Sequence, residues 1–174
     1  MITRQIILES FKTVRQHTME IARDIPAEKY DFRPVEGSSS VIEHFLDIIQ
    51  ITQFMVEAAL TKEPIHVTFE TRNEVFARVI PIKTANVTTK DEVIILLEQS
   101  LESIVSRVEA ADEAYLNETF IAPDRVEKVR LWVINCAKEQ EMARRAQLFL
   151  IERMLGIIPH TTRRQKAAEA MVKK

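Results

Sequence analysis

The spacing of apolar residues along the chain predicts four long amphipathic helices. In each of them, apolar side chains recur at intervals of three and four, which gathers them on one face of a helix. The predicted helices cover residues 2–24, 40–60, 89–111 and about 124–155. The second is apolar around much of its circumference, which is typical of a helix at the centre of a bundle. We therefore predict an all-α protein.

Local signals mark where these helices begin and end. Ser40 with Glu43, and Thr89 with Glu92, match a capping box. In such a box the hydroxyl accepts a hydrogen bond from the first turn, and the glutamate accepts one from the amide of the capping residue. Gly156 follows the fourth helix and tolerates the positive φ that ends many helices. These signals fix the start of the second and third helices to a single residue.

The segment between the second and third helices has no clear period. Residues 62–88 contain Pro64 and Pro81 and alternate only weakly between apolar and polar positions. A helix of about 20 residues spans about 30 Å, and these 27 residues can cover that distance easily. We therefore predict a long crossover between two parallel helices, giving a four-helix bundle with an up-down-down-up course.

Composition narrows the class of protein. The chain has 174 residues, with 24 Lys and Arg against 26 Asp and Glu, so its net charge of -2 argues against nucleic acid or an anionic membrane as a partner. Two glycines and 6 prolines suit long helices with few turns. The single cysteine, Cys136, excludes an internal disulfide and favours a cytoplasmic location, and we see neither a signal peptide nor a membrane span. We expect one bundle domain over residues 1–160 and a polar, basic tail over residues 161–174, either a short frayed helix or disordered.

Two polar residues interrupt the apolar stripe of the fourth helix. Gln140 and Arg144 lie one turn apart on a face that otherwise reads Val, Val, Val, Ala, Leu, Ile and Leu. A buried guanidinium needs a carboxylate partner, because an unpaired buried charge costs several kcal/mol. The alternative is that Arg144 lies at the edge of the stripe and extends its charge into solvent.

The second helix offers the partner for this arginine. His44 and Asp47 lie three residues apart on one stripe of that helix. Glu139 and Glu141 are the local alternatives as partners of Arg144, but both fit a solvated face better. In the first helix, Arg15 also falls largely away from the apolar stripe of that helix. We therefore expect Asp47 to face Arg144 across the bundle.

Several short motifs together resemble the DinB/YfiT-like superfamily. They run in order along nearly the whole chain: Tyr30, Phe32-Arg33-Pro34, Gly37, Ser40 to Ile48, Arg144 to Leu148, and Gly156 to Pro159. The resemblance implies a four-helix bundle with the same up-down-down-up course and a long link between its second and third helices. The crossover inferred from the residues alone agrees with it.

The resemblance also implies a metal site, from which this sequence departs. Members of the family usually bind a divalent metal through a histidine seven residues after the serine of the second helix and two histidines four apart on the fourth. Those positions hold Asp47, Gln140 and Arg144 here. An arginine has no lone pair to offer a metal. We predict that no metal or other cofactor is bound there, and that Arg144 pairs with Asp47 while Gln140 or His44 completes the hydrogen bonds.

Two functional classes follow from the resemblance. Metal-dependent members are transferases or isomerases that use a low-molecular-weight thiol such as bacillithiol, mycothiol or glutathione, with zinc or nickel as the metal. Degenerate members keep the bundle and act as binding or stress-associated proteins. We favour the second class, as a homodimer with a possible small-molecule ligand in the bundle cavity, and keep the first as the alternative.

The remaining candidate groups carry no motif. His17, His66 and His160 have no partner in the sequence, and we assign them no chemistry. Cys136 lies among apolar residues and is interpreted as a buried, inert thiol rather than a nucleophile.

Overall fold

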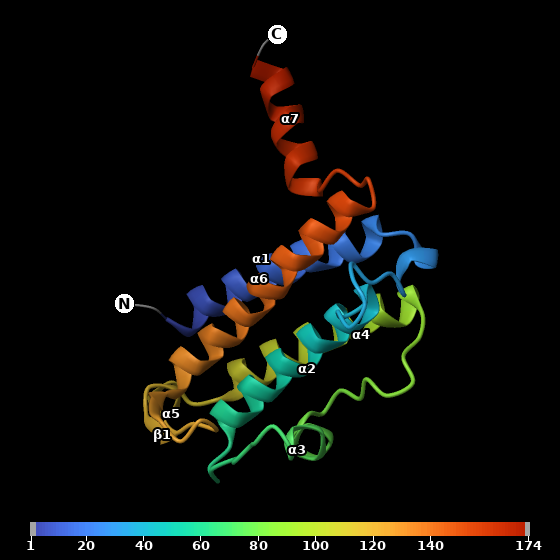
Figure 1. The fold of residues 1–174 in the computed structure, drawn as a ribbon. Coiled ribbons are helices and arrows are strands. Elements are labelled where there is room, and N and C mark those ends of the chain that lie inside the picture. The colour runs from blue at the N-terminus through green and yellow to red at the C-terminus, as the bar shows by residue number, and fades with distance from the viewer. Residues whose placement is uncertain (1–2, 173–174) are drawn as a thin grey trace.

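Four long helices form the body of the protein (Figure 1). The structure, a computed structural model, describes residues 3–172. The predicted helix start at Ile2 and the last two residues of the predicted tail, Lys173 and Lys174, lie outside the described residues. The bundle helices are α1 (Arg4–Asp24), α2 (Val41–Leu60), α4 (Lys90–Ala110) and α6 (Arg130–Met154). The predicted four-helix bundle is therefore confirmed. Within residues 3–172, none of the helices is both long and apolar enough to cross a membrane.

Both predicted capping boxes are confirmed. The Ser40 side chain accepts from the Glu43 amide at the start of α2, and the Glu43 carboxylate accepts from the Ser40 amide. Thr89 and Glu92 make the same reciprocal pair at the start of α4. Gly156, with φ of 77°, follows α6 as predicted. Each of these helix ends is determined by residues within about one turn of the chain, which is why the sequence predicts them.

The crossover between α2 and α4 contains one short helix, α3 (Arg72–Val79). It packs against α2, where the rings of Phe54 and Phe76 stack with 4.5 Å between their centroids.

Contacts between α2 and α4 show how these two helices are directed. The Gln53 side chain donates to the Ser100 carbonyl oxygen at 2.8 Å, and Arg107 pairs with Glu57. Residues thus meet in the same order along α2 and α4, so these two helices run in the same direction.

A small hairpin replaces the predicted start of the fourth helix. After α5 (Glu113–Leu116), strand β1 (Thr119–Ile121) pairs antiparallel with β2 (Glu127–Val129), and α6 begins only at Arg130. The tight turn between the strands places Arg125 at φ of 64°. The Arg130 guanidinium lies 4.1 Å from the centroid of the Tyr115 ring and donates to the Ala59 carbonyl oxygen. The prediction of a helix from about Asp124 was therefore wrong by about one and a half turns.

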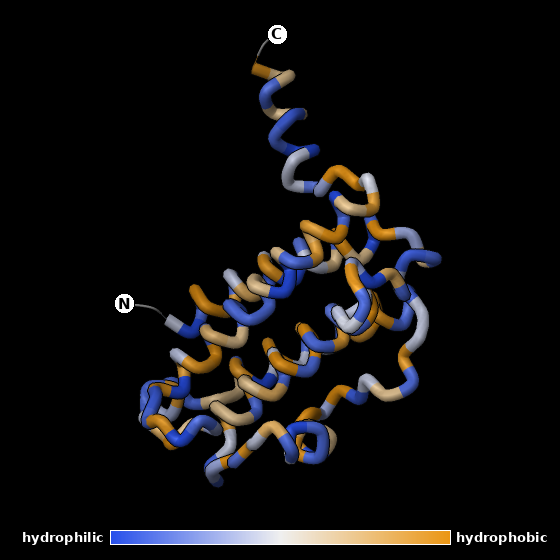
Figure 2. Tube along the Cα trace, viewed as in Figure 1, coloured by the Kyte–Doolittle hydropathy of each residue, from blue (hydrophilic) through white to orange (hydrophobic). Residues whose placement is uncertain are grey.

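Most of the predicted tail forms a further helix, which is one of the two alternatives that the sequence left open. This helix, α7 (His160–Val172), follows α6 after a short loop. The remaining short element, a 3-10 turn η1 (Ala27–Lys29), follows α1. Figure 1 shows α7 extending away from one end of the bundle, and Figure 2 shows it as predominantly hydrophilic. Within α7, only His160 is buried.

The core contains two large apolar clusters with a polar layer between them, and a smaller third cluster where α3 packs on α2. One large cluster gathers residues such as Ile21, Phe45 and Leu148, and the other gathers residues such as Phe11 and Val56. The layer between them is formed by buried polar residues from all four bundle helices: Arg15 and Thr18 from α1, Thr52 and Gln53 from α2, Ser100 from α4, and Glu141 from α6.

This polar layer corrects two expectations. Glu141, assigned to a solvated face, and Arg15, placed largely away from the apolar stripe, both have completely buried side chains. Arg15 follows Phe11 by four residues, and Glu141 follows Ala137 by four, so both lie on the buried stripes of their helices. The core stripe of α6 passes through position 141 rather than through 140, which moves Gln140 to the surface.

Candidate functional site

The predicted contact between the second and fourth bundle helices is present. The Nε of Arg144 on α6 donates to one carboxylate oxygen of Asp47 on α2. The other oxygen of Asp47 accepts from Arg72 of α3 at 2.8 Å. One carboxylate therefore holds two guanidinium groups from different helices.

Gln140 completes the cluster. Its side-chain oxygen accepts from a terminal nitrogen of Arg144 at 2.9 Å, so the three positions singled out in the sequence do converge. The contact lies at the edge of the bundle, as the exposure of the side chains shows: 21% of Arg144 and 32% of Asp47 are exposed. The ion pair is present as predicted, and the partial exposure of Arg144 matches the alternative in which it lies at the edge of the apolar stripe. We call Asp47, Arg72, Gln140 and Arg144 the polar cluster.

His44 stands beside the polar cluster without joining it. The ring is half-buried one turn before Asp47, and no hydrogen bond links it to another side chain among residues 3–172. Burial is the main cause that lowers the pKa of His44, and Arg144 lowers it further while Asp47 raises it. Gln140, rather than His44, thus supplies the remaining hydrogen bond to Arg144.

An apolar groove of about 290 Å³ begins at Gln140. Its walls include Phe54 and Met55 of α2 and Trp132 of α6, with Cys136 at its side. Burial raises the pKa of the Cys136 thiol, which keeps the sulfur protonated and weakly nucleophilic near neutral pH. The thiol is partly exposed, not fully buried as expected. Gln140 thus connects the polar cluster to this largely apolar groove, whose lining also includes the ion pair of Lys128 with Asp124.

Sequence comparison assigns this fold to a family. The sequence profile of the DinB superfamily matches residues 10–148. The chain belongs to the DinB superfamily. No curated protein matches the chain.

The solved structures with a similar fold include the following two. A DinB-like protein of Bacillus subtilis is 19% identical, with a TM-score of 0.65 over 87% of this chain and 93% of that one. A mutant of the mycothiol-dependent maleylpyruvate isomerase is 14% identical, with a TM-score of 0.56 over 91% of this chain. This chain spans 65% of the length of that isomerase. At these identities the likeness concerns the fold.

The donor atoms at the polar cluster do not fit a divalent metal. Asp47 could be a ligand, but both of its oxygens already accept from guanidinium groups. Arg144 and Arg72 are permanent cations without a free lone pair, so a metal ion among them would meet repulsion rather than ligation. Gln140 offers a single amide oxygen, a weak donor. This chemistry disagrees with the three-histidine site that the family resemblance implies.

Sequence reasoning found three of the four cluster residues and missed Arg72. The crossover that carries Arg72 has no period from which a contact with α2 could be inferred. Its only local signal is the apolar pair Val75 and Phe76, which directs α3 against α2.

Proposed function

We propose that this DinB-superfamily protein binds a small molecule at the polar cluster and its apolar groove without using a metal there. The observation that carries the proposal is the Arg144–Asp47 ion pair. A side-chain cation occupies the place at which the family resemblance implies an inorganic one. Such a protein would bind, and would not activate a thiol by metal coordination.

The charge balance indicates the class of ligand. Arg72 and Arg144 together carry two positive charges against the single negative charge of Asp47. A carboxylate or phosphate group can accept the guanidinium hydrogens that point away from Asp47. The groove beside Gln140 offers aromatic and aliphatic walls to an apolar body. The ligand proposed is therefore a small amphipathic anion.

A designed metal site tests the metal-free assignment. The triple variant Asp47→His, Gln140→His and Arg144→His places three imidazoles where the side chains now converge. We expect the triple variant, purified without a tag, to bind one more equivalent of Zn²⁺ or Ni²⁺ per chain than the unmodified protein. Elemental analysis after dialysis measures the metal content. Metal in the unmodified protein that is lost on Asp47→Ala would overturn the proposal.

The alternative is a thiol-dependent transferase or isomerase. The fold likeness to the mycothiol-dependent maleylpyruvate isomerase favours it. The replaced ligand positions argue against it. We expect no turnover of maleylpyruvate with mycothiol, with or without added Zn²⁺. Turnover that survives Arg144→Ala and requires Asp47 would favour the alternative.

We also propose that the protein is a cytoplasmic homodimer. The outer face of α6 supports self-association, because Leu150 and Met154, one turn apart on that helix, are each at least half exposed. The apolar residues of α2 are mostly used within the bundle, so they do not supply this surface. Light scattering coupled to size exclusion chromatography would give one subunit mass if the proposal is wrong.

A further inference from the structure

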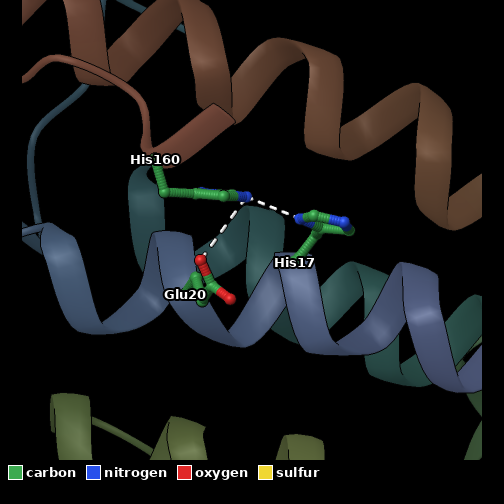
Figure 3. A group of neighbouring side chains, drawn as sticks. All are labelled: His17, Glu20 and His160. Atoms are coloured by element: carbon green, nitrogen blue, oxygen red, sulfur yellow. Dashed lines mark hydrogen bonds and ion pairs between the residues drawn. The ribbon is translucent and has the colours of Figure 1, made fainter. Parts of the chain in front are cut away.

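A second group of polar side chains lies where α7 meets the bundle. Figure 3 shows His17 and Glu20 of α1 directed at the ring of His160, the first residue of α7. His17 Nδ1 lies 2.7 Å from His160 Nε2, and that nitrogen lies 3.8 Å from a carboxylate oxygen of Glu20. The three potential ligand atoms lie within 4.8 Å of one another. We call these residues the α1–α7 cluster.

His160 is held firmly at this place. Its side chain is only 2% exposed, and its ring stacks on His17 at 4.9 Å and packs against Phe149 at 5.5 Å between centroids. The buried Nδ1 of His160 has no hydrogen-bond partner among residues 3–172. Packing against His17 and Phe149 therefore orients the ring, with its Nε2 directed toward His17 and Glu20.

Glu20 is oriented from the opposite side. Arg164 of α7 donates to one of its oxygens, which leaves the other oxygen toward His160. A hydrogen bond of this kind to the second oxygen is what commonly fixes a carboxylate that ligates a metal through the first. The cluster thus has two nitrogen donors and one oriented oxygen donor.

Two imidazoles and one carboxylate match a known donor preference. Zn²⁺ and similar divalent transition metals bind neutral imidazole nitrogen and carboxylate oxygen in tetrahedral sites, and a two-histidine, one-glutamate set leaves the fourth position to water. The two facing nitrogens now share a hydrogen bond, so one of them carries a hydrogen, which must move to the other nitrogen of its ring before both can bind a metal. The charged groups near the two rings have both signs: the carboxylates of Glu20 and Asp24, and the guanidinium groups of Arg145 and Arg164.

We propose that His17, Glu20 and His160 bind one divalent transition metal ion of the Zn²⁺ class, which fastens α7 to the bundle. This site is independent of the polar cluster, which lies between α2, α3 and α6. The other links between α7 and α1 are ion pairs of partly exposed side chains, Arg163 with Asp24 and Arg164 with Glu20. Ion pairs between partly exposed side chains contribute little to stability. The metal would therefore set the position of α7.

Calorimetry with the metal alone tests the site. Full-length untagged protein is stripped with a chelator and titrated with ZnCl₂. We expect one equivalent per chain, at least tenfold weaker binding for His17→Ala and for His160→Ala, and a smaller loss for Glu20→Gln. Absence of Zn²⁺ binding by the unmodified protein, or unchanged binding by both histidine variants, would overturn the proposal.

Control variants separate this site from other sources of binding. His66→Ala removes an exposed histidine of the crossover and leaves binding unchanged. Asp47→Asn also leaves it unchanged; loss on Asp47→Asn with retention in His17→Ala would refute both the α1–α7 site and the metal-free polar cluster. Circular dichroism and thermal melting of the metal-free variants establish that each is folded. Substitution with Co²⁺ should give no thiolate charge-transfer band, and such a band would assign the metal to Cys136 instead.

Discussion

Arg15 of α1 and Glu141 of α6 form a two-pronged ion pair at the centre of the bundle, with neither side chain exposed at all. The two bonds join Nε and one terminal nitrogen of Arg15 to the two carboxylate oxygens, at 2.8 and 2.9 Å. The remaining hydrogens of the guanidinium go to the Leu97 carbonyl oxygen and to the hydroxyls of Ser100 and Thr52. All five N–H groups that an arginine possesses are thereby satisfied.

Breaking this pair should strongly destabilise the fold. Glu141→Ala leaves the buried guanidinium without a counter-charge, which costs about 3–5 kcal/mol. For a chain of this size each kcal/mol lowers the melting temperature by about 2–4 °C. We expect thermal denaturation followed by circular dichroism to show a loss of at least about 6 °C.

The double variant Arg15→Met with Glu141→Leu is the matched comparison. Because it removes both charges and restores similar apolar volume, it should be clearly more stable than Glu141→Ala alone. Equal melting temperatures for the single and double variants would mean that the lost charge pairing is not what destabilises the protein.

Removal of the Asp47 carboxylate should have a much smaller effect. Asp47 and Arg144 are both partly exposed, so water can replace the lost partner of each guanidinium. We expect Asp47→Asn to lower the free energy of unfolding by at most about 1 kcal/mol, measured in urea, and the difference to shrink at high salt. A loss as large as that of Glu141→Ala would show that the cluster is buried in solution.

The buried carboxyl of Glu152 should make stability depend on pH. Its two oxygens have no hydrogen-bond partner among residues 3–172, and burial, reinforced by Asp24, raises its pKa from 4.5 to about 7. The folded protein therefore holds a proton that the unfolded chain releases above pH 4.5. The resulting stability is fully present below pH 4.5 and is lost as pH rises through 7.

Glu152→Gln should remove this dependence. We expect the variant to match the unmodified protein at pH 4 and to exceed its free energy of unfolding at pH 8 by up to about 3 kcal/mol. Urea denaturation at both pH values measures the difference. Glu139→Gln, at an exposed position of the same helix, is the control and should show no such gain at pH 8. A constant difference between Glu152→Gln and the unmodified protein at both pH values would contradict the assignment.

The sequence predicted best what depends on neighbouring residues. The capping boxes at Ser40 and Thr89 and the helix end at Gly156 were all found, because each is set within one turn of chain. The contact between Asp47 and Arg144 was also found, since both the helical stripe and the family resemblance led to it.

The sequence failed where tertiary contacts decide the environment of a charge. Arg15 and Glu141 each lie on an apolar stripe, but a charged residue type favours a solvated interpretation until its partner on a distant helix is known. For the same reason His17 and His160 carried no signal, because 143 positions separate them and only the turn after α6 brings them together. The crossover residue Arg72 had no period at all from which its contact could be inferred.

The central polar layer fixes how the four long helices are aligned along their axes. Apolar side chains tolerate sliding by a turn, about 5.4 Å, because one aliphatic surface resembles the next. A guanidinium that must meet acceptors on three other helices tolerates no such slip, and it sits at mid-length. Variation can therefore accumulate at both extremities, in the groove by the hairpin and at the joint of α7, while the alignment of the long helices stays unchanged.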